Sequence, residues 1–349
     1  MTAYVLVTGG TGFIGSHTAV ALQQAGHPVL ILDNLGNSEP QVLERIAAIT
    51  GERPKFVAGD VRDAITLKEI FERHDITAVL HFAGLKAVGE STANPLAYYD
   101  NNVGGSARLL EAMQAAGVRT LVFSSSATVY GNPERLPLDE SHPRHATNPY
   151  GNTKIVVEDL MGSLYESEAG WRMARLRYFN PVGSHPSGLL GESPRGIPNN
   201  LMPYVAQVAS GERDRLRIFG NDYETHDGTG VRDYIHVMDL AEGHVRALHY
   251  CASQASELLT VNLGTGLGYS VLDVVHAFEG ASRRHLPYEF LPRRPGDIAA
   301  CWAETSQAER KLGWKARRSI DEMCEDAWRW TRHRRGGVVA AGSSPWAVN

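Results

Sequence analysis

The sequence predicts an α/β fold, in which a doubly wound parallel sheet is joined to a smaller C-terminal α/β lobe. Short apolar runs that suit buried parallel strands alternate with helical stretches through the first half of the chain. A glycine-rich turn connects the first of these runs to the first helix. The second half lacks this regular alternation, which indicates a separate lobe with a different arrangement.

The composition is that of a globular protein with a sizeable core, since 43% of the 349 residues are hydrophobic and 21% are charged. The net charge of −5 and the shortness of the one basic cluster, at residues 332–335, argue against a nucleic-acid partner. No apolar run approaches the roughly 18 residues of a membrane span. The strand pattern starts at Tyr4, and the three cysteines form no Cys-x-x-Cys pair. We therefore expect a cytoplasmic protein that has no metal site and no membrane partner.

The first predicted strand, at residues 4–8, runs into the glycine-rich turn at residues 9–15 and then into a helix. Such glycines allow a tight turn whose backbone N–H groups approach a pyrophosphate at the start of the helix. The second predicted strand ends in Asp33, whose carboxylate suits the two hydroxyls of an adenosine ribose and repels a 2′-phosphate. Asn34 follows, where an arginine would favour NADP. These features predict an NAD site.

Three further strands and two helices are predicted downstream, at residues 55–58, 78–82 and 120–123 and at residues 67–73 and 96–116. Ligands of open α/β sheets bind where the strands end. Asp60 follows one strand end and is either an acceptor for an adenine amino group or a cap of the next helix. His81 lies in an apolar run and is expected to pack within the sheet. Asn101 is either a buried hydrogen-bonding group or a cofactor contact.

Tyr150 and Lys154 are four residues apart, and Asn148 and Pro149 suit the cap and the first position of a helix. The two side chains then share one helix face. A nearby ammonium group stabilises a phenolate and lowers the pKa of the phenol from about 10, so that tyrosine becomes a general base. Ser126 follows a predicted strand end, which brings a hydroxyl to the same crevice. By itself the Tyr-x-x-x-Lys pair is more typical of a solvated helix face than of a catalytic site.

The chain resembles the extended short-chain dehydrogenase/reductase family, and within it the UDP-glucose 4-epimerases, from about residue 5 to about residue 330. The resemblance is carried by long colinear stretches at residues 8–17, 32–34, 81–91, 124–131, 150–154, 177–183, 196–203 and 228–239. It implies a Rossmann-type NAD-binding domain at residues 1–180 and a mainly substrate-binding lobe at residues 181–335, with segments that return to the first domain. Residues 336–349, which begin with a glycine-rich stretch, are expected to form a flexible tail.

The activity that the resemblance implies is reversible 4-epimerisation of UDP-glucose and UDP-galactose. Tyr150 is then the base, Lys154 binds the nicotinamide ribose and holds the phenolate, and Ser126 contacts the 4-oxygen of the sugar. Hydride passes to bound NAD, and the transient 4-keto sugar turns over before hydride returns to its other face. NAD is regenerated in each turnover, so we expect it to be held tightly. The family also implies a homodimer built through helices that flank the sheet.

The resemblance assigns individual contacts to both ligands. The implied cofactor contacts are Gly9, Gly12, Phe13, Ile14, Gly15, Asp33, Asn34, Asp60, Val61, Phe82, Ala83, Gly84, Lys86, Asn101, Tyr150, Lys154 and Phe179. The implied substrate contacts are Asn180, Arg232 and Arg294 at the diphosphate, Leu201 and Phe219 near the uracil, Asp297 at a ribose hydroxyl, and Lys86, Ser126, Tyr150, Asn200 and Cys301 near the sugar. Outside such motifs an arginine is more often a surface ion-pair partner.

Cys301 stands where the bacterial form of the family carries a bulky tyrosine at the hexose end of the pocket. The smaller cysteine leaves room for a 2-acetamido group. We therefore expect activity on UDP-N-acetylglucosamine and UDP-N-acetylgalactosamine as well. The alternative is that neighbouring side chains refill the space.

Three other functions suit the same fold. A sugar-nucleotide 4,6-dehydratase needs an acidic pair where this chain has Ala127 and Thr128. A non-catalytic NAD sensor has no need of an intact Ser126, Tyr150 and Lys154. A UDP-glucuronate epimerase needs a cationic group for the sugar carboxylate, and the sequence shows no added motif of that kind. The sequence thus favours the epimerase, with another NAD-dependent sugar-nucleotide enzyme as the alternative.

Overall fold

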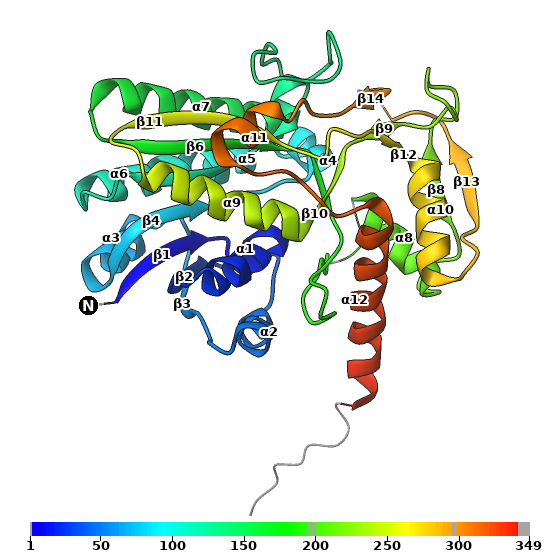
Figure 1. The fold of residues 1–349 in the computed structure, drawn as a ribbon, viewed down its shortest axis with the longest axis horizontal. Helices are drawn as coiled ribbons and strands as arrows, with labels where there is room; N and C mark the ends of the chain where they lie inside the picture. Colours follow the sequence, from blue (N-terminus) through cyan, green and yellow to red (C-terminus); the bar gives the residue numbers. More distant parts are fainter. Residues whose placement is uncertain (1, 195, 197, 199, 295–296, 341–349) are drawn as a thin grey trace, which may run out of the picture.

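A seven-stranded parallel sheet forms the centre of the larger part of the molecule (Figure 1). The computed structural model describes residues 2–194, 196, 198, 200–294 and 297–340. The strand order is β11-β6-β5-β4-β1-β2-β3. The strands are β1 (Ala3–Thr8), β2 (Val29–Asp33), β3 (Lys55–Ala58), β4 (Asp75–His81), β5 (Thr120–Ser126), β6 (Arg172–Tyr178) and β11 (Glu257–Leu263). This order confirms the predicted doubly wound α/β fold.

Helices cover both faces of the sheet because successive side chains of a buried strand point to opposite faces. Val5 and Val7 of β1 belong to one core, and Leu6 between them belongs to the other. The first core is covered by α1 (Phe13–Gln24), α2 (Gln41–Thr50), α9 (Val237–Ala252) and α11 (Ser306–Leu312). The second is covered by α3 (Ala64–Arg73), α6 (Gly105–Ala115) and α7 (Pro149–Ser167).

The predicted strands of the first half are all present, although β4 begins three residues earlier than the predicted run and β5 continues through Ser126. Two strands of the sheet were not predicted. The apolar pattern of β6 is interrupted by Arg175 and Arg177. Its neighbour β11 comes from the second half of the chain, and the register pairs Tyr178 with Leu263.

The long helix predicted over residues 96–116 is divided into three pieces. They are α5 (Pro95–Tyr98), the π-helical turn η1 (Tyr99–Gly104) and α6. A π-helical turn inside a helix is uncommon and is frequently found at functional sites. Here the π-helical turn contains Asn101 and Asn102. A helix that packs on the sheet therefore carries two amide side chains at this point.

The smaller lobe lies beside the sheet, on the right in Figure 1, and has its own core. Its helices are α8 (Leu201–Ala209), α10 (Val271–Ser282) and α12 (Ile320–Ala340). Its short strands form three groups: β7 (Asn180–Val182) with β10 (Tyr234–His236), β8 (Leu216–Phe219) with β13 (Tyr288–Leu291), and β9 (Val231–Arg232) between β12 (Tyr269–Ser270) and β14 (Ala300–Cys301).

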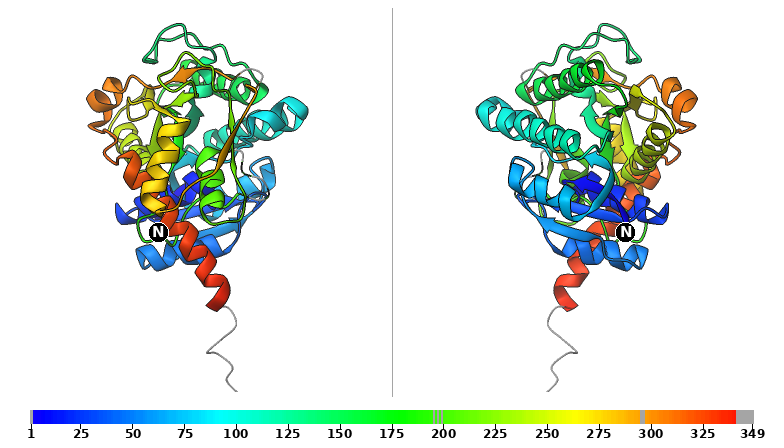
Figure 2. Two further views of the ribbon diagram at one scale, coloured as in Figure 1. Left: turned by 90° about the vertical axis from the view of Figure 1, so that its right-hand side faces the viewer. Right: turned by 90° about the vertical axis from the view of Figure 1, so that its left-hand side faces the viewer.

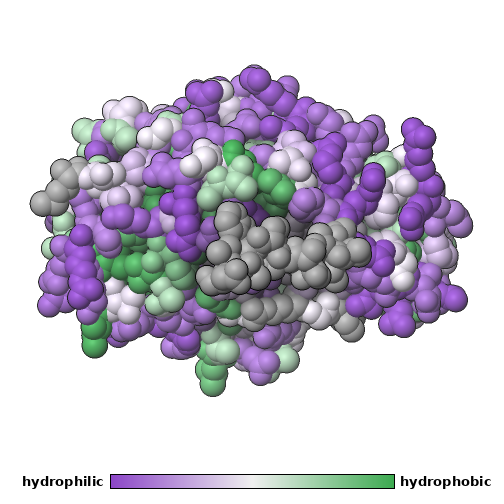
Figure 3. Space-filling view, turned by 90° about the horizontal axis from the view of Figure 1, so that it is seen from below, coloured by the Kyte–Doolittle hydropathy of each residue, from purple (hydrophilic) through white to green (hydrophobic). Residues whose placement is uncertain are grey.

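Helix α12 extends into the part of the chain that was predicted to be a flexible tail. It continues to Ala340 and projects from the body of the molecule (Figures 1 and 2). The predicted flexible tail thus starts with five helical residues, 336–340, and its remaining residues, 341–349, lie outside the described part of the chain. The face seen from below is mainly hydrophilic, with apolar side chains in patches (Figure 3). None of the described helices is long and apolar enough to cross a bilayer.

Candidate active site

The glycine-rich turn between β1 and α1 has room for backbone only. Gly9 has a φ of 68°, and a Cβ there would lie 2.7 Å from the backbone nitrogen of Ala83. A Cβ on Gly15 would lie 2.4 Å from the carbonyl oxygen of Gly9. Among the described side chains, none caps the N-terminus of α1 at Gly12. Its first N–H groups therefore suit an anion, and this turn fits the pyrophosphate of a dinucleotide.

Asp33 ends β2 next to this turn. Its carboxylate accepts hydrogen bonds from the backbone nitrogens of Thr11, at 3.0 Å, and Leu35, at 2.8 Å. A carboxylate has about four acceptor positions, so it can still accept from ribose hydroxyls. Asn34 donates to Asp60 at 3.0 Å, which links the ends of β2 and β3. The structure thus places the predicted adenosine contacts at one edge of the sheet.

Asp60 does not cap the next helix. The cap of α3 is Asp63, which accepts from the backbone nitrogen of Ile65 at 3.0 Å. Asp60 instead forms an ion pair with Arg62 at 2.8 Å, and hydrogen bonds from Arg62 hold the pKa of Asp60 well below its usual range. Val61 is 4% exposed and packs in the core, so only its backbone is available to a ligand.

His81 is a packed residue of β4, as predicted. Its Nδ1 lies 2.7 Å from the hydroxyl of Thr8, and its Nε2 lies 2.9 Å from the hydroxyl of Ser106. Burial, together with the charge of Lys154, lowers the pKa of His81 to about 3. The imidazole is therefore neutral and serves to connect strands and helix within the sheet.

Tyr150 and Lys154 lie in the first turns of α7. The helix begins as predicted, with Pro149 in its first turn and the side chain of Asn148 accepting from the backbone nitrogen of Gly151 at 2.9 Å. A Cβ on Gly84, just after β4, would lie 3.8 Å from Nζ of Lys154. The loop after β4 thus brings the glycine-rich turn and the Tyr-Lys pair to one edge of the sheet.

The ammonium group of Lys154 donates to the carbonyl oxygen of Ser124 at 2.6 Å and lies 5.8 Å from the ring centroid of Tyr150. Burial lowers the pKa of Lys154 to about 8, although the charge of Glu158 opposes this shift. Burial also raises the pKa of Tyr150, and its hydrogen bond with Ser126 only partly offsets the rise. The prediction that Lys154 lowers the pKa of this phenol is therefore wrong for the chain by itself, because desolvation dominates.

The three serines at the end of β5 have different partners. The hydroxyl of Ser124 bonds to that of Tyr178, and Ser125 donates to the carboxylate of Glu158 at 2.6 Å. Ser126 accepts from the backbone nitrogen of Thr128 at 3.2 Å and caps the short helix η2 (Ala127–Tyr130). Of the three, Ser126 is the one whose hydroxyl acts on the pKa of Tyr150, which it lowers.

Two buried residues behind the site were not predicted. The carboxylate of Glu158 accepts a hydrogen bond from Nη2 of Arg177 at 2.6 Å. Glu158 lies one turn beyond Lys154 on α7. Burial alone would raise the pKa of Glu158, but the hydrogen bonds and charge of Arg177 lower it below its usual value. Asn102 holds both backbone groups of Leu85, at 2.8 and 3.0 Å, and so fixes the loop after β4. Lys154 and Glu158 are four residues apart, so the sequence alone could have indicated that they share one face of the helix.

The predicted substrate residues of the smaller lobe are already engaged with one another. Arg232 forms an ion pair with Asp297. The guanidinium carbon of Arg294 lies 3.9 Å from the ring centroid of Phe219. These contacts form two pairs, in which Phe219 of β8 and Arg232 of β9 meet residues of the segment between β13 and β14.

The other predicted contacts have various surroundings. Asn180 begins β7, and Phe179 lies just before it at 6% exposure. Leu201 starts α8 and packs against the core of the smaller lobe. Cys301, on β14, is 8% exposed and shares an apolar cluster with Phe179. The cluster also contains Val129, Tyr130, Leu138 and Ala303.

Residues 6–327 match the GDP-mannose 4,6 dehydratase family. A UDP-glucose 4-epimerase from Bacillus subtilis (strain 168) is 54% identical over 337 residues, which cover 97% of this chain and 99% of that protein. One from Yersinia pestis is 56% identical over 328 residues, with 94% and 97% covered. The chain belongs to the UDP-glucose 4-epimerase family.

Solved structures of this epimerase family agree with the fold. The enzyme from Stenotrophomonas maltophila, solved with bound NAD and formylated UDP-arabinopyranose, has a TM-score of 0.94 at 53% identity and covers 96% of this chain and 99% of that one. The enzyme from Bifidobacterium longum, in complex with NAD+ and UDP, has a TM-score of 0.92 at 50% identity, with 96% and 100% covered. Membership of the epimerase family confirms the resemblance found in the sequence.

Proposed function

We propose that this protein interconverts UDP-glucose and UDP-galactose by NAD-dependent epimerisation at carbon 4 of the sugar. The observation that carries the proposal is the position of Ser126, Tyr150 and Lys154 at the carboxyl edge of the sheet, within reach of a glycine-rich turn that admits only backbone. Full-length similarity to UDP-glucose 4-epimerases supports the same activity.

The chain's own residues move the proton. When bound, NAD takes the hydride from carbon 4 and gives it back, and its oxidised ring carries a positive charge. Tyr150 accepts the proton of the 4-hydroxyl, which reaches it directly or through the hydroxyl of Ser126, and later returns it. Lys154 keeps its ammonium group next to the phenol. The C4–H bond that breaks is formed again on the opposite face of the 4-keto sugar, so no net oxidation occurs.

A sugar that turns over between these steps has to be anchored elsewhere. The diphosphate and the uridine are the available handles, and guanidinium groups suit phosphate oxygens. We assign this anchoring to Arg232 and Arg294, with Asp297 at the uridine ribose. This assignment requires Arg232 to exchange its ion pair with Asp297 for phosphate oxygens.

A dehydratase is the nearest alternative, and the matching family profile is described by that activity. Elimination of water needs an acid and a base beside the strand-end hydroxyl. Here the position is occupied by η2, whose residues Ala127, Thr128, Val129 and Tyr130 include no carboxylate. This observation favours epimerisation.

Incubation with UDP-galactose, without added NAD, tests the proposal. The purified protein is expected to form UDP-glucose and to contain bound nicotinamide. Tyr150→Phe should retain the cofactor and lose about 10²- to 10⁴-fold in kcat, because a general base is removed. Tyr165→Phe, on the same helix, is the matched control and should leave kcat unchanged. Full activity of Tyr150→Phe would contradict the assignment.

The small side chain of Cys301 supports a wider sugar range. Burial raises the pKa of Cys301 to about 12, so the thiol is neutral and presents a compact apolar surface. We infer that the protein also turns over UDP-N-acetylgalactosamine. Cys301→Tyr should abolish that turnover and spare UDP-galactose. Undetectable turnover of the acetylated sugar by the unmodified protein would show that the cluster around Phe179 already fills the space.

We also infer a cytoplasmic homodimer that forms through the helices flanking the sheet. Leu96, Tyr99 and Val156 lie on α5, η1 and α7 and are 84%, 39% and 38% exposed. Exposed apolar side chains gathered on adjoining helices are typical of an interface. Sedimentation analysis of Leu96→Lys, with Leu267→Lys as a control on another surface, tests the assignment.

A further inference from the structure

Glu192 connects the two parts of the molecule at the sugar end of the site. Its Oε1 accepts from Nζ of Lys86 at 3.1 Å and from Nδ2 of Asn200 at 2.9 Å. Lys86 follows β4 of the large sheet, whereas Asn200 precedes α8 of the smaller lobe. The carboxylate side chain is 13% exposed. One oxygen atom therefore holds two predicted site residues from opposite sides.

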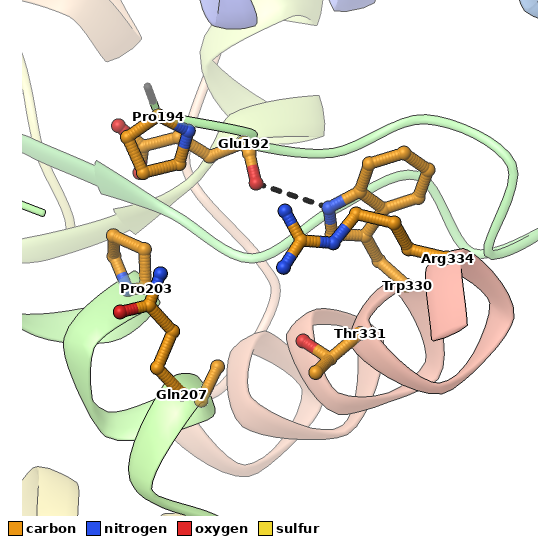
Figure 4. Close-up of a pocket in the computed structure, with 8 residues that line it drawn as sticks. Glu192, Pro194, Pro203, Gln207, Trp330, Thr331 and Arg334 are labelled. Atoms are coloured by element: carbon orange, nitrogen blue, oxygen red, sulfur yellow. Dashed lines mark hydrogen bonds between the residues drawn. The ribbon is translucent and has the colours of Figure 1, made fainter. Parts of the chain in front are cut away.

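The backbone that carries Glu192 is fixed on two sides. Its carbonyl oxygen accepts from the indole nitrogen of Trp330 at 3.0 Å (Figure 4). A Cβ on Gly191 would lie 2.5 Å from both the Trp330 ring and the hydroxyl of Ser184, so the chain passes too close for any other residue. The loop also reaches the nucleotide-binding part, because the ring of His17 lies between the carbonyl oxygens of Phe13, at 2.6 Å, and Leu190, at 3.2 Å.

The side chain of Asn200 is oriented by Glu192 and not by its own helix. Asn200 occupies the N-cap position of α8, where asparagine is among the most favourable residues. Yet its side chain makes no capping hydrogen bond to the described helix and donates to Glu192 instead. The amide group is thus directed by the carboxylate and away from the contact that local helix stability favours.

The pocket beside Glu192 is too small to be a ligand site that would require a carboxylate at this position. The pocket that Glu192 lines with Pro203, Gln207, Trp330 and Arg334 has room for about 20 Å³, which is enough for about one water molecule (Figure 4). No substrate fits there. The functional contacts of Glu192 are therefore those with Lys86 and Asn200.

A carboxylate at the sugar end of the site also repels the negatively charged sugar nucleotide unless a cation balances it. Lys86 provides that balance. We propose that Glu192 is a positioning residue, which sets Lys86 and Asn200 for the sugar from the two sides of the site. The inference rests on the proposed epimerase function and adds to it a residue that joins the cofactor-binding sheet to the substrate lobe.

Kinetics of Glu192→Gln and Glu192→Ala with UDP-galactose test this role. The glutamine is nearly isosteric and loses only the charge, so kcat should fall about tenfold, while KM should change less than about threefold because the nucleotide is anchored elsewhere. The alanine should cost more. Bound nicotinamide and Tm should stay at their unmodified values. Glu289→Gln removes an exposed carboxylate from β13 of the same lobe and is the matched control.

A double-mutant cycle with Lys86→Met separates positioning from general loss of structure. Glu192→Gln should cost about tenfold in the unmodified background and less than about threefold when Lys86 is already absent. Equal costs in both backgrounds, or full activity of Glu192→Gln in an active parent, would overturn the inference. A parent that does not interconvert the two UDP-hexoses would instead overturn the proposed function, and the inference with it.

Discussion

The two ends of the predicted site are held by different kinds of contact. The glycine-rich turn is shaped by backbone packed against backbone, with Gly9 against Ala83 and Gly15 against Gly9. The substrate end is shaped by charged side chains that pair with one another, as in Arg232 with Asp297. The first arrangement is preorganised for a cofactor that stays. In the proposed function, a substrate replaces one partner of the second arrangement.

The largest expected effect lies at the backbone end. In Gly15→Ala the new Cβ would lie 2.4 Å from a carbonyl oxygen, so the turn has to open. We expect a loss of bound nicotinamide and of turnover by at least about 100-fold, measured on the purified protein.

Gly162→Ala is the control for that variant. Gly162 lies in α7, and apart from its chain neighbours and the nearby helix backbone no described atom lies within 4 Å of the Cβ that would be added. It should bind nicotinamide normally and unfold with a free energy about 0.5–1 kcal/mol higher. Retention of stoichiometric nicotinamide by Gly15→Ala would show that the turn is more adaptable than its packing indicates.

Lys154→Met tests the junction between the two ends and should make the protein inactive but more stable. Burial lowers the pKa of Lys154 from 10.5 to about 8, so the folded state carries the full cost of a buried ammonium group below pH 8. Its removal should raise the free energy of unfolding at pH 7 by about 1–3 kcal/mol, after the lost hydrogen bond to Ser124 is counted.

The stability difference between Lys154→Met and its parent should depend on pH. Between pH 8 and 10.5 the unfolded chain holds more protons at Lys154 than the folded chain, so the unmodified protein gains stability from this group as pH rises. The difference between Lys154→Met and its parent should therefore shrink across this range in urea unfolding experiments. A methionine variant that is less stable at pH 7 would contradict the assignment of a net cost.

The smallest effect is expected at the exchangeable end. Phe219→Leu removes the aromatic face under Arg294, at 3.9 Å. An exposed cation–π contact is worth about 0.5–1 kcal/mol, so Kd for UDP should rise about two- to fivefold in calorimetry. Phe290→Leu, on the paired strand β13 and 42% exposed, should leave Kd unchanged. Equal affinities of both variants would place the uracil elsewhere.

Local signals in the sequence were enough to predict the first five strands and the Tyr150–Lys154 pair, because each depends on residues close together in the chain. Strand β6 was missed because Arg175, which is partly buried, and Arg177, which is buried, both pair with other elements, which a strand pattern cannot show. Glu192 was missed for the same kind of reason, since its partner Lys86 is 106 residues away.

The pKa of Tyr150 shows a second limit. The spacing to Lys154 correctly predicts a shared helix face. The direction of the pKa shift of Tyr150, however, depends on how completely the fold removes water from the phenol and on which acceptor the ammonium group of Lys154 donates to. The chosen acceptor, the carbonyl of Ser124, is a backbone atom, and no residue type in the sequence indicates it.

The strand order also limits how such a chain can exchange segments with a relative. β11 pairs with β6 over seven residue positions, and α9 covers the same part of the sheet. A chimera with a single crossover at residue 180 would thus place a foreign edge strand and a foreign helix against the parental sheet. Grafts that alter sugar preference can exchange residues 181–230 and the strand that carries Cys301, so that residues 237–263 stay with the parent whose first half they complete.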